Sequence, residues 1–216
     1  SASFIPVYAR LLAEGRRQES TRVAGAVGAL LALLTSGLVA IGVFATPWLI
    51  DAIAPGFEGE KRELTVRLVR ILSPGAGVLV MSAWCLGVLN SHRRFLLSYA
   101  APVVWNLAII VALILGGQRN LQAFALAEVA AWGSVVGSVL QFALQLPVVL
   151  SMLRGVRFVP ALDDVHVRTV LRNFAPVFVG RGVVQISGYI DTLLASLLPD
   201  STRGGPTVHT GQPLSI

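Results

Sequence analysis

The chain has 216 residues, of which 55% are apolar and only 13% charged, and its mean hydropathy is +0.74. Soluble domains carry about 25% charged residues, so this composition argues against an ordinary soluble enzyme. It also argues against a disordered chain, which would be rich in charge. The net charge is +6, but the basic residues stand between long apolar runs, which favours a membrane topology signal and no nucleic-acid partner.

Five long apolar runs follow one another along the chain, and each exceeds the about 20 residues that a membrane-spanning helix needs. Backbone groups in lipid must be bonded within their own segment, so each run is expected to be a helix. A very apolar soluble bundle is the alternative, but it would have almost no wettable face. We predict an amphipathic leading segment and cytoplasmic link over 1–22. The spans are predicted at about 23–53, 64–90, 95–117, 121–153 and 167–199, together covering 23–199, and a disordered or aberrant tail at 200–216.

The basic residues between the runs indicate an orientation. Ten arginines fall in the leading segment and in the links after the second and fourth runs, against six basic residues in the remaining links and the tail. Cytoplasmic loops are enriched in Lys and Arg. The count therefore predicts a cytoplasmic N-terminal end and, with five spans, a C-terminal end outside.

No pattern of catalytic or metal-binding residues stands out. The three histidines, His92, His166 and His209, lie in links and in the tail without metal-ligand spacing, and Cys85 has no second cysteine to pair with. An enzyme is the least favoured class, and neither a cofactor nor a metal is expected.

Polar residues at membrane depth are the informative ones, because charges there are costly and usually face a cavity or a partner. On the fifth predicted helix, Arg181 and Gln185 share one face, and Asp191 lies beside it, about 15 Å along the axis from Arg181. One interpretation is that each charge pairs with another helix or snorkels. The other is a wet path in which Arg181 attracts an anion and Asp191 a cation or proton.

Two further groups of residues have both structural and functional interpretations. Asn106, Gln141, Gln145 and Gln185 more often form interhelical hydrogen bonds than bind ligands. Arg93 and Arg94 suit anionic lipid headgroups, although a role in topology is favoured.

Small residues four apart, at Gly133 and Gly137, predict a close helix–helix approach.

An ordered set of short segments resembles one family of membrane transporters. The segments are SASFIPVYA at 1–9, APGF at 54–57, GVLNSHRRF at 87–95, AAPVVWN at 100–106, QLP at 145–147 and QISGYIDTLLAS at 185–196. Together they resemble the MurJ/MviN lipid II flippase family of the multidrug/oligosaccharidyl-lipid/polysaccharide exporter superfamily. The resemblance covers residues 1 to about 199, so the chain looks like part of the N-terminal lobe, starting at the end of the family's second helix.

The resemblance implies an all-α polytopic transmembrane bundle in the bacterial cytoplasmic membrane. It implies movement of a lipid-linked peptidoglycan precursor across that membrane by alternating access, with membrane lipids and cell-wall synthesis proteins as further partners. Asp191 matches a family position for a coupling cation, Na⁺ or H⁺, while Arg181 matches no motif. Substrate-path candidates are Arg181, Gln185, Asn106, Arg93 and Arg94. A related lipid-linked oligosaccharide or drug exporter and an inert membrane scaffold (a pseudo-flippase) are the alternatives.

Overall fold

The computed structural model of the chain describes residues 3–53, 57–119, 121–174, 176, 179, 180, 187 and 188. It divides into two units, Ser1–Asn173 and Phe174–Ile216. In the second unit every described residue is helical. Arg181, Gln185, Asp191 and the tail 200–216 lie outside the described residues.

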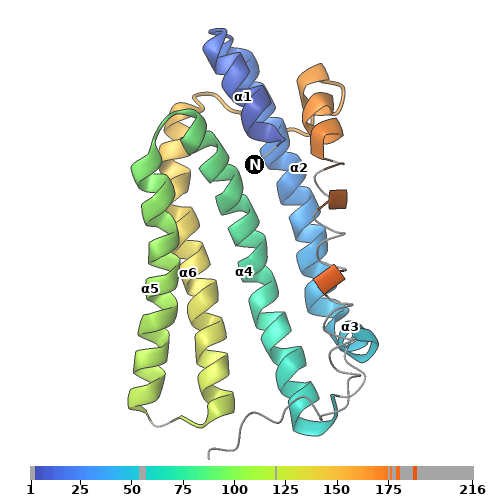
Figure 1. Cartoon of the computed structure of the whole chain (residues 1–216), viewed down its shortest axis with the longest axis vertical. Helices are drawn as coiled ribbons and strands as arrows, with labels where there is room; N and C mark the ends of the chain where they lie inside the picture. Colours follow the sequence, from blue (N-terminus) through green and yellow to red (C-terminus); the bar gives the residue numbers. More distant parts are fainter. Residues whose placement is uncertain are drawn as a thin grey trace, which may run out of the picture. The chain divides into compact units, whose positions relative to one another are not determined.

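The first unit is built from helices that run up and down beside one another (Figure 1). The described helices are α1 (Phe4–Ala13), α2 (Arg17–Phe44), α3 (Thr46–Ile53), α4 (Gly59–Ser91), α5 (Phe95–Gln118) and α6 (Ala123–Met152), and residues 165–173 are also helical. No strand occurs among the described residues, so the all-α prediction is confirmed. We call the two ends of this bundle the α1 end and the α3 end.

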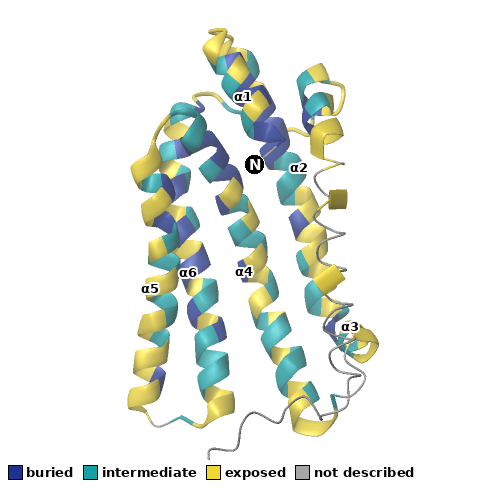
Figure 2. Cartoon of the chain, viewed as in Figure 1, coloured by how far each residue is buried: buried dark blue, intermediate teal, exposed yellow. Residues whose placement is uncertain are grey.

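Four of these helices, α2, α4, α5 and α6, are long and apolar enough to cross a membrane. Their outer faces carry large apolar side chains that no described part of the chain covers (Figure 2). Leu33 is 68% exposed and Ile114 is 54% exposed. Water does not favour contiguous apolar surface of this extent, whereas hydrocarbon does, so these faces fit lipid and disfavour the soluble-bundle alternative.

The predicted span at 23–53 is divided in the structure, because α2 ends at Phe44 and α3 begins at Thr46. The cause is Pro47, which lacks the N–H that would bond to the carbonyl of Val43. Arg70 Nε of α4 donates to that carbonyl instead, at 3.1 Å, and the Thr46 hydroxyl donates to the carbonyl of Gly42. The carbonyl that the proline leaves without a helical donor is thus bonded by a side chain, as a break near hydrocarbon requires.

Other helix ends also differ from the predicted ranges. The first helix boundary falls at Arg17 rather than near residue 23, which leaves a link of only three residues, 14–16, after α1. α4 begins at Gly59 rather than near residue 64. Both extensions are polar turns that hydropathy alone does not assign to a spanning helix.

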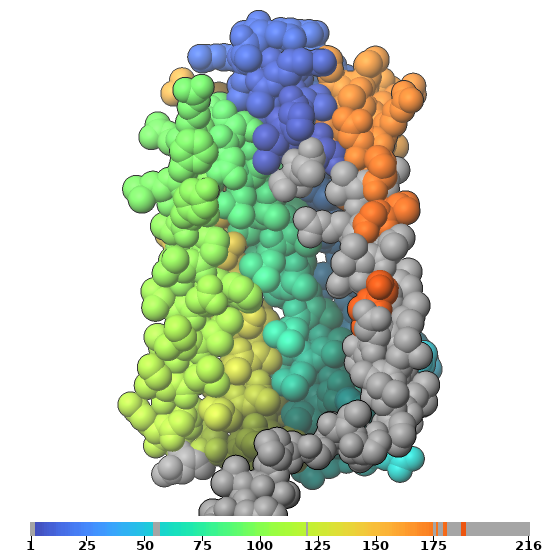
Figure 3. Space-filling model, viewed as in Figure 1, coloured from blue at the N-terminus to red at the C-terminus, as the bar shows by residue number. Residues whose placement is uncertain are grey.

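Small residues set the closest helix contacts. A Cβ added at Gly133 would lie 2.5 Å from Ala112 Cβ, and one at Gly137 would lie 2.8 Å from the carbonyl oxygen of Trp105. The pair therefore lets α6 approach α5 closely, as its spacing predicts. Side chains fill the space between the ribbons of α4, α5 and α6 (Figure 3).

The buried apolar core lies toward the α1 end of the bundle. Its members come from α1, α2, α4, α6 with the residue after it, and the helical residues that begin at 165. They include Tyr8, Leu11, Val88, Val149 and Val170. α1 contributes Phe4, Val7, Tyr8 and Leu11, one face of an amphipathic helix. This packing holds the helix ends around the cavity described next.

Candidate functional site: an arginine-lined cavity at the α1 end

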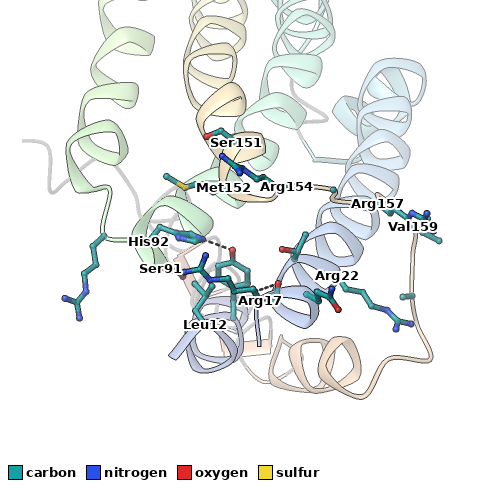
Figure 4. Close-up of a pocket in the computed structure, with 17 residues that line it drawn as sticks. Leu12, Arg17, Arg22, Ser91, His92, Ser151, Met152, Arg154, Arg157 and Val159 are labelled. Atoms are coloured by element: carbon teal, nitrogen blue, oxygen red, sulfur yellow. Dashed lines mark hydrogen bonds between the residues drawn. The ribbon is translucent and has the colours of Figure 1, made fainter. Parts of the chain in front are cut away.

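A cavity of about 1470 Å³ opens at the α1 end of the bundle. Its walls are the first turns of α2, the link between α4 and α5, the end of α6 with the segment after it, and part of α1. Figure 4 shows Arg17, His92 and Arg154 around the same space, with Arg22 and Arg157 further along toward Val159. Arg93 also lines the cavity.

Tight C-terminal turns place these side chains. The α4 helix ends in a Schellman motif, in which Arg94 N–H donates to the Leu89 carbonyl at 2.9 Å and Arg93 N–H to the Asn90 carbonyl at 3.1 Å. The position in the left-handed region is Arg93, with φ of 59°. A glycine usually occupies this position because it has no Cβ penalty. The chain therefore carries an arginine where the backbone would favour glycine.

The other two turns at the cavity have the usual residue. α1 ends with Gly15 at φ 74°, and the segment after α6 has Gly155 at φ 75°. The segment after α6 then passes directly over α2, where a Cβ added at Gly25 would lie 2.4 Å from the carbonyl oxygen of Arg157. Gly25 thus makes room for the backbone of the segment after α6, although its spacing of four residues from the small residue Ala29 is of the kind that predicts a neighbouring helix.

The charge balance of the cavity is one-sided. Of the described residues, five arginines line it and no aspartate or glutamate does. Carboxylates at this end of the bundle are already paired with other bases: Glu14 with Arg10 and Arg16, Glu19 with Arg16 and His166, Asp163 with Arg168, and Asp164 with Arg22. Among the described residues, Arg17, Arg93, Arg154 and Arg157 therefore have no carboxylate partner.

The excess of positive charge affects the pKa of His92. Its pKa is lowered from the ordinary value, first by burial and then by the charges of Arg17 and Arg94. The imidazole is therefore neutral at pH 7, and its Nε2 lies 3.0 Å from the Tyr8 hydroxyl of α1. This hydrogen bond ties the α4–α5 link to α1 at the floor of the cavity.

Of the candidate residues that the sequence suggested, only some lie at the cavity. Arg93 lines the cavity, whereas Arg94 is the exposed N-cap of α5 and does not. Asn106 lies within α5, and its Nδ2 donates to the Pro102 carbonyl of its own helix at 3.0 Å. The roles of Arg181, Gln185 and Asp191 stay predictions, since these residues lie outside the described ones.

Sequence reasoning missed Arg17, Arg154, Arg157 and His92 as site residues, because it read the arginines only as topology signals. The signal that was available is their position. Each of them lies close to the end of a predicted span. Because consecutive spans run in opposite directions, these particular ends lie on the same side of the bundle.

A second polar cluster joins α4 to α6 in the interior. The fully buried Ser82 hydroxyl donates to Gln145 Oε1 at 2.6 Å and accepts from Gln141 Nε2 at 2.7 Å. The interhelical role predicted for these two glutamines is confirmed. Gln141 Oε1 and Gln145 Nε2 have no partner among the described residues.

Comparison with known proteins identifies the sequence relatives. The family model described as "Lipid II flippase MurJ" matches residues 1–205. The chain is 30% identical over 205 residues to "Lipid II flippase MurJ" of Burkholderia cenocepacia, covering 92% of this chain and 39% of the relative. It is 31% identical over 208 residues to "Probable lipid II flippase MurJ" of Rhizobium tropici, covering 91% of this chain and 37% of the relative. The chain thus spans about two fifths of the length of these relatives.

Proposed function

The chain belongs to the lipid II flippase MurJ family, and on this premise we propose that it forms part of one lobe of a protein that moves a lipid-linked peptidoglycan precursor across the bacterial cytoplasmic membrane. The observation that carries the proposal is the match of the family model to residues 1–205. The four apolar helices of the bundle are of the kind that such a transporter requires.

The physical task suits this architecture. A polar headgroup must cross about 30 Å of hydrocarbon, so the protein must offer a polar path while its outside stays apolar. Alternating access moves rigid helical lobes against each other and needs no covalent chemistry. The bundle supplies such a lobe, because its α5–α6 contact is close and its outer faces are apolar.

We further propose an orientation with the α1 end in the cytoplasm. Ten arginines lie at that end: Arg10, Arg16, Arg17, Arg22, Arg93, Arg94, Arg154, Arg157, Arg168 and Arg172. At the α3 end the described basic residues are Lys61, Arg62, Arg67, Arg70 and Arg119. The α1 end thus carries more basic residues than the α3 end, and by the positive-inside rule the end richer in Lys and Arg faces the cytoplasm.

Asp191 is our proposed cation site, with Na⁺ or H⁺ as the coupling ion and with Arg181 and Gln185 along the substrate path. The support is chemical. A carboxylate within a predicted spanning segment is costly to keep unless an ion or a partner compensates it.

A chimera tests the function. The segment of the B. cenocepacia flippase that matches this chain is replaced by the chain itself, and growth is measured in cells depleted of their own flippase. We expect the chimera to restore growth, and Asp191→Asn to weaken the rescue. A chimera that reaches the membrane at normal levels without restoring growth contradicts the proposed function. Full rescue by the Asp191→Asn chimera contradicts the cation site alone.

A further inference from the structure

The arginine-lined cavity has a surplus of positive charge that the described carboxylates do not neutralise. Four lining arginines lack a carboxylate partner among the described residues, and the neighbouring carboxylates are committed to other bases. Like charges brought around one space repel each other. A ligand that supplies negative charge would relieve this repulsion, so the cavity is built to favour an anion.

The donor set is better matched to phosphate than to a single carboxylate. Guanidinium groups present several N–H donors in a rigid fork that fits phosphate oxygens in pairs. Arg17 and Arg154 approach the same space from different elements (Figure 4). Arg17 is also the first residue of α2, so the positive end of that helix dipole adds to the field.

We propose that this cavity binds the phosphate group of an anionic ligand, with Arg17 and Arg154 as its principal contacts and Arg93 and Arg157 as secondary ones. The site goes beyond the proposed transport function and does not depend on it. Two sources share this chemistry, namely the headgroup of an anionic lipid and a soluble phosphate or diphosphate.

The surroundings of the cavity bear on the source. The first turn of α5, which follows Arg93 and Arg94, carries apolar side chains that nothing described covers, and Leu96 is 87% exposed. Because Arg93 lines the cavity and lies two residues before the start of α5, a lipid headgroup bound at Arg93 would have this apolar surface near its acyl chains. The phosphate of a lipid would thus meet the arginines at the level where spanning helices end.

The test uses the purified full chain in detergent micelles. One arm measures binding of phosphatidylglycerol against phosphatidylcholine, each doped into the micelles, and the other measures binding of inorganic pyrophosphate by calorimetry. The test variant is Arg17→Gln with Arg154→Gln. The matched control is Arg10→Gln with Arg119→Gln, which removes the same charge from residues outside the cavity.

We expect at least one arm to show binding that the test variant weakens tenfold or more and that the control retains within twofold. Preference for phosphatidylglycerol without pyrophosphate binding assigns a lipid headgroup, and the reverse assigns a soluble phosphate. Competition between phosphatidylglycerol and pyrophosphate assigns a site that accepts both. Absence of both interactions in the unmodified chain, or equal weakening in the test variant and the control, overturns the proposal.

A second variant keeps the test decisive if the double substitution fails to fold. Arg93→Gly removes one cavity charge at a position whose backbone already favours glycine. It is expected to fold and to weaken binding two- to fivefold. Unchanged binding in Arg93→Gly, together with unchanged binding in Arg157→Gln, would overturn the assignment of the site to this cavity.

Discussion

The arginines of α4 at the α3 end and the arginines that line the cavity at the α1 end differ in their partners within the protein. At the α3 end the arginines of α4 each have a partner within the protein: Arg62 bonds Asp51 through two nitrogens at 2.7 and 2.8 Å, Arg67 bonds Glu128 of α6 at 2.7 Å, and Arg70 bonds the Val43 carbonyl. At the α1 end, four of the five arginines that line the cavity have no carboxylate partner among the described residues. The comparison shows that an arginine count, which serves for topology, does not distinguish cations that hold helices together from cations left for a ligand.

The largest effect is expected from Gly25→Ala, at the cavity end of α2. The new Cβ would lie 2.4 Å from the Arg157 carbonyl oxygen and 2.7 Å from Val156 Cγ2. Overpacking of this kind costs about 1–3 kcal/mol, and it would also displace the cavity wall. Thermal unfolding in detergent measures the loss.

Gly37→Ala is the matched control on the same helix, since nothing lies within 4 Å of its added Cβ. It should stabilise α2 by about 0.5–1 kcal/mol through helix propensity. Equal effects of the two substitutions would show that the segment after α6 does not pack on α2.

The next effect concerns the interior between the two ends. Ser82→Ala removes the hydroxyl that both bonds Gln145 and accepts from Gln141. Leaving buried polar groups unpaired costs about 1–3 kcal/mol in proteins generally, and interhelical bonds in membranes average about 0.6 kcal/mol. We therefore expect a loss of about 1 kcal/mol, measured by the same unfolding experiment.

Ser73→Ala on the same helix serves as the comparison, because its hydroxyl bonds only the Val69 carbonyl of its own turn. Its loss should stay below that of Ser82→Ala. A larger loss for Ser73→Ala would contradict an α4–α6 clamp.

Arg93→Gly should raise stability by up to about 1 kcal/mol, because a left-handed conformation costs a residue with a Cβ about 1–2 kcal/mol and the greater freedom of glycine in the unfolded chain offsets part of the gain. The arginine holds a left-handed φ of 59° that glycine adopts without a Cβ penalty. The same substitution at Arg94, whose φ is −88°, should give no gain. A gain at both positions would mean that relief of charge repulsion, not backbone strain, is responsible.

The smallest expected effect is on the pH dependence of stability, to which His92 at the α1 end and Asp51 at the α3 end contribute in different pH ranges. The lowered pKa of His92 makes the folded chain bind its proton less readily than the unfolded chain, so stability falls as the pH drops below about 6.5. The pKa of Asp51 is also lowered, chiefly by its hydrogen bond to Arg62. Stability from Asp51 is present above about pH 4 and is lost as the pH falls through its lowered value.

Unfolding temperatures measured from pH 8 to pH 3 should therefore decline in two stages. His92→Gln should flatten the first stage. Asp51→Asn should reduce the second stage, to which Glu19 also contributes because its hydrogen bond to Arg16 lowers its pKa. If the decline at the higher pH persists in His92→Gln, the histidine does not cause it.

Hydropathy and spacing predicted much of the bundle but little of the site. The α5 and α6 runs and the Gly133/Gly137 contact follow from local composition and periodicity. The break before Thr46 was missed because the apolar run continues through Pro47, and its rescue by Arg70 comes from a helix far along the chain. The cavity was missed because it needs four separate segments brought together, and because only the structure shows which carboxylates are already paired.

The most direct measurement is the sidedness of the two ends in intact bacteria. Arg154→Cys at the cavity end and Glu60→Cys at the α3 end are each introduced into the chimera with Cys85, which is fully buried, replaced by alanine. A thiol reagent that cannot cross the membrane is predicted to label position 60 from outside, and position 154 only after the membrane is permeabilised. Labelling of both positions from outside, or of 154 alone, would contradict a membrane-spanning lobe whose unpaired arginines face the cytoplasm.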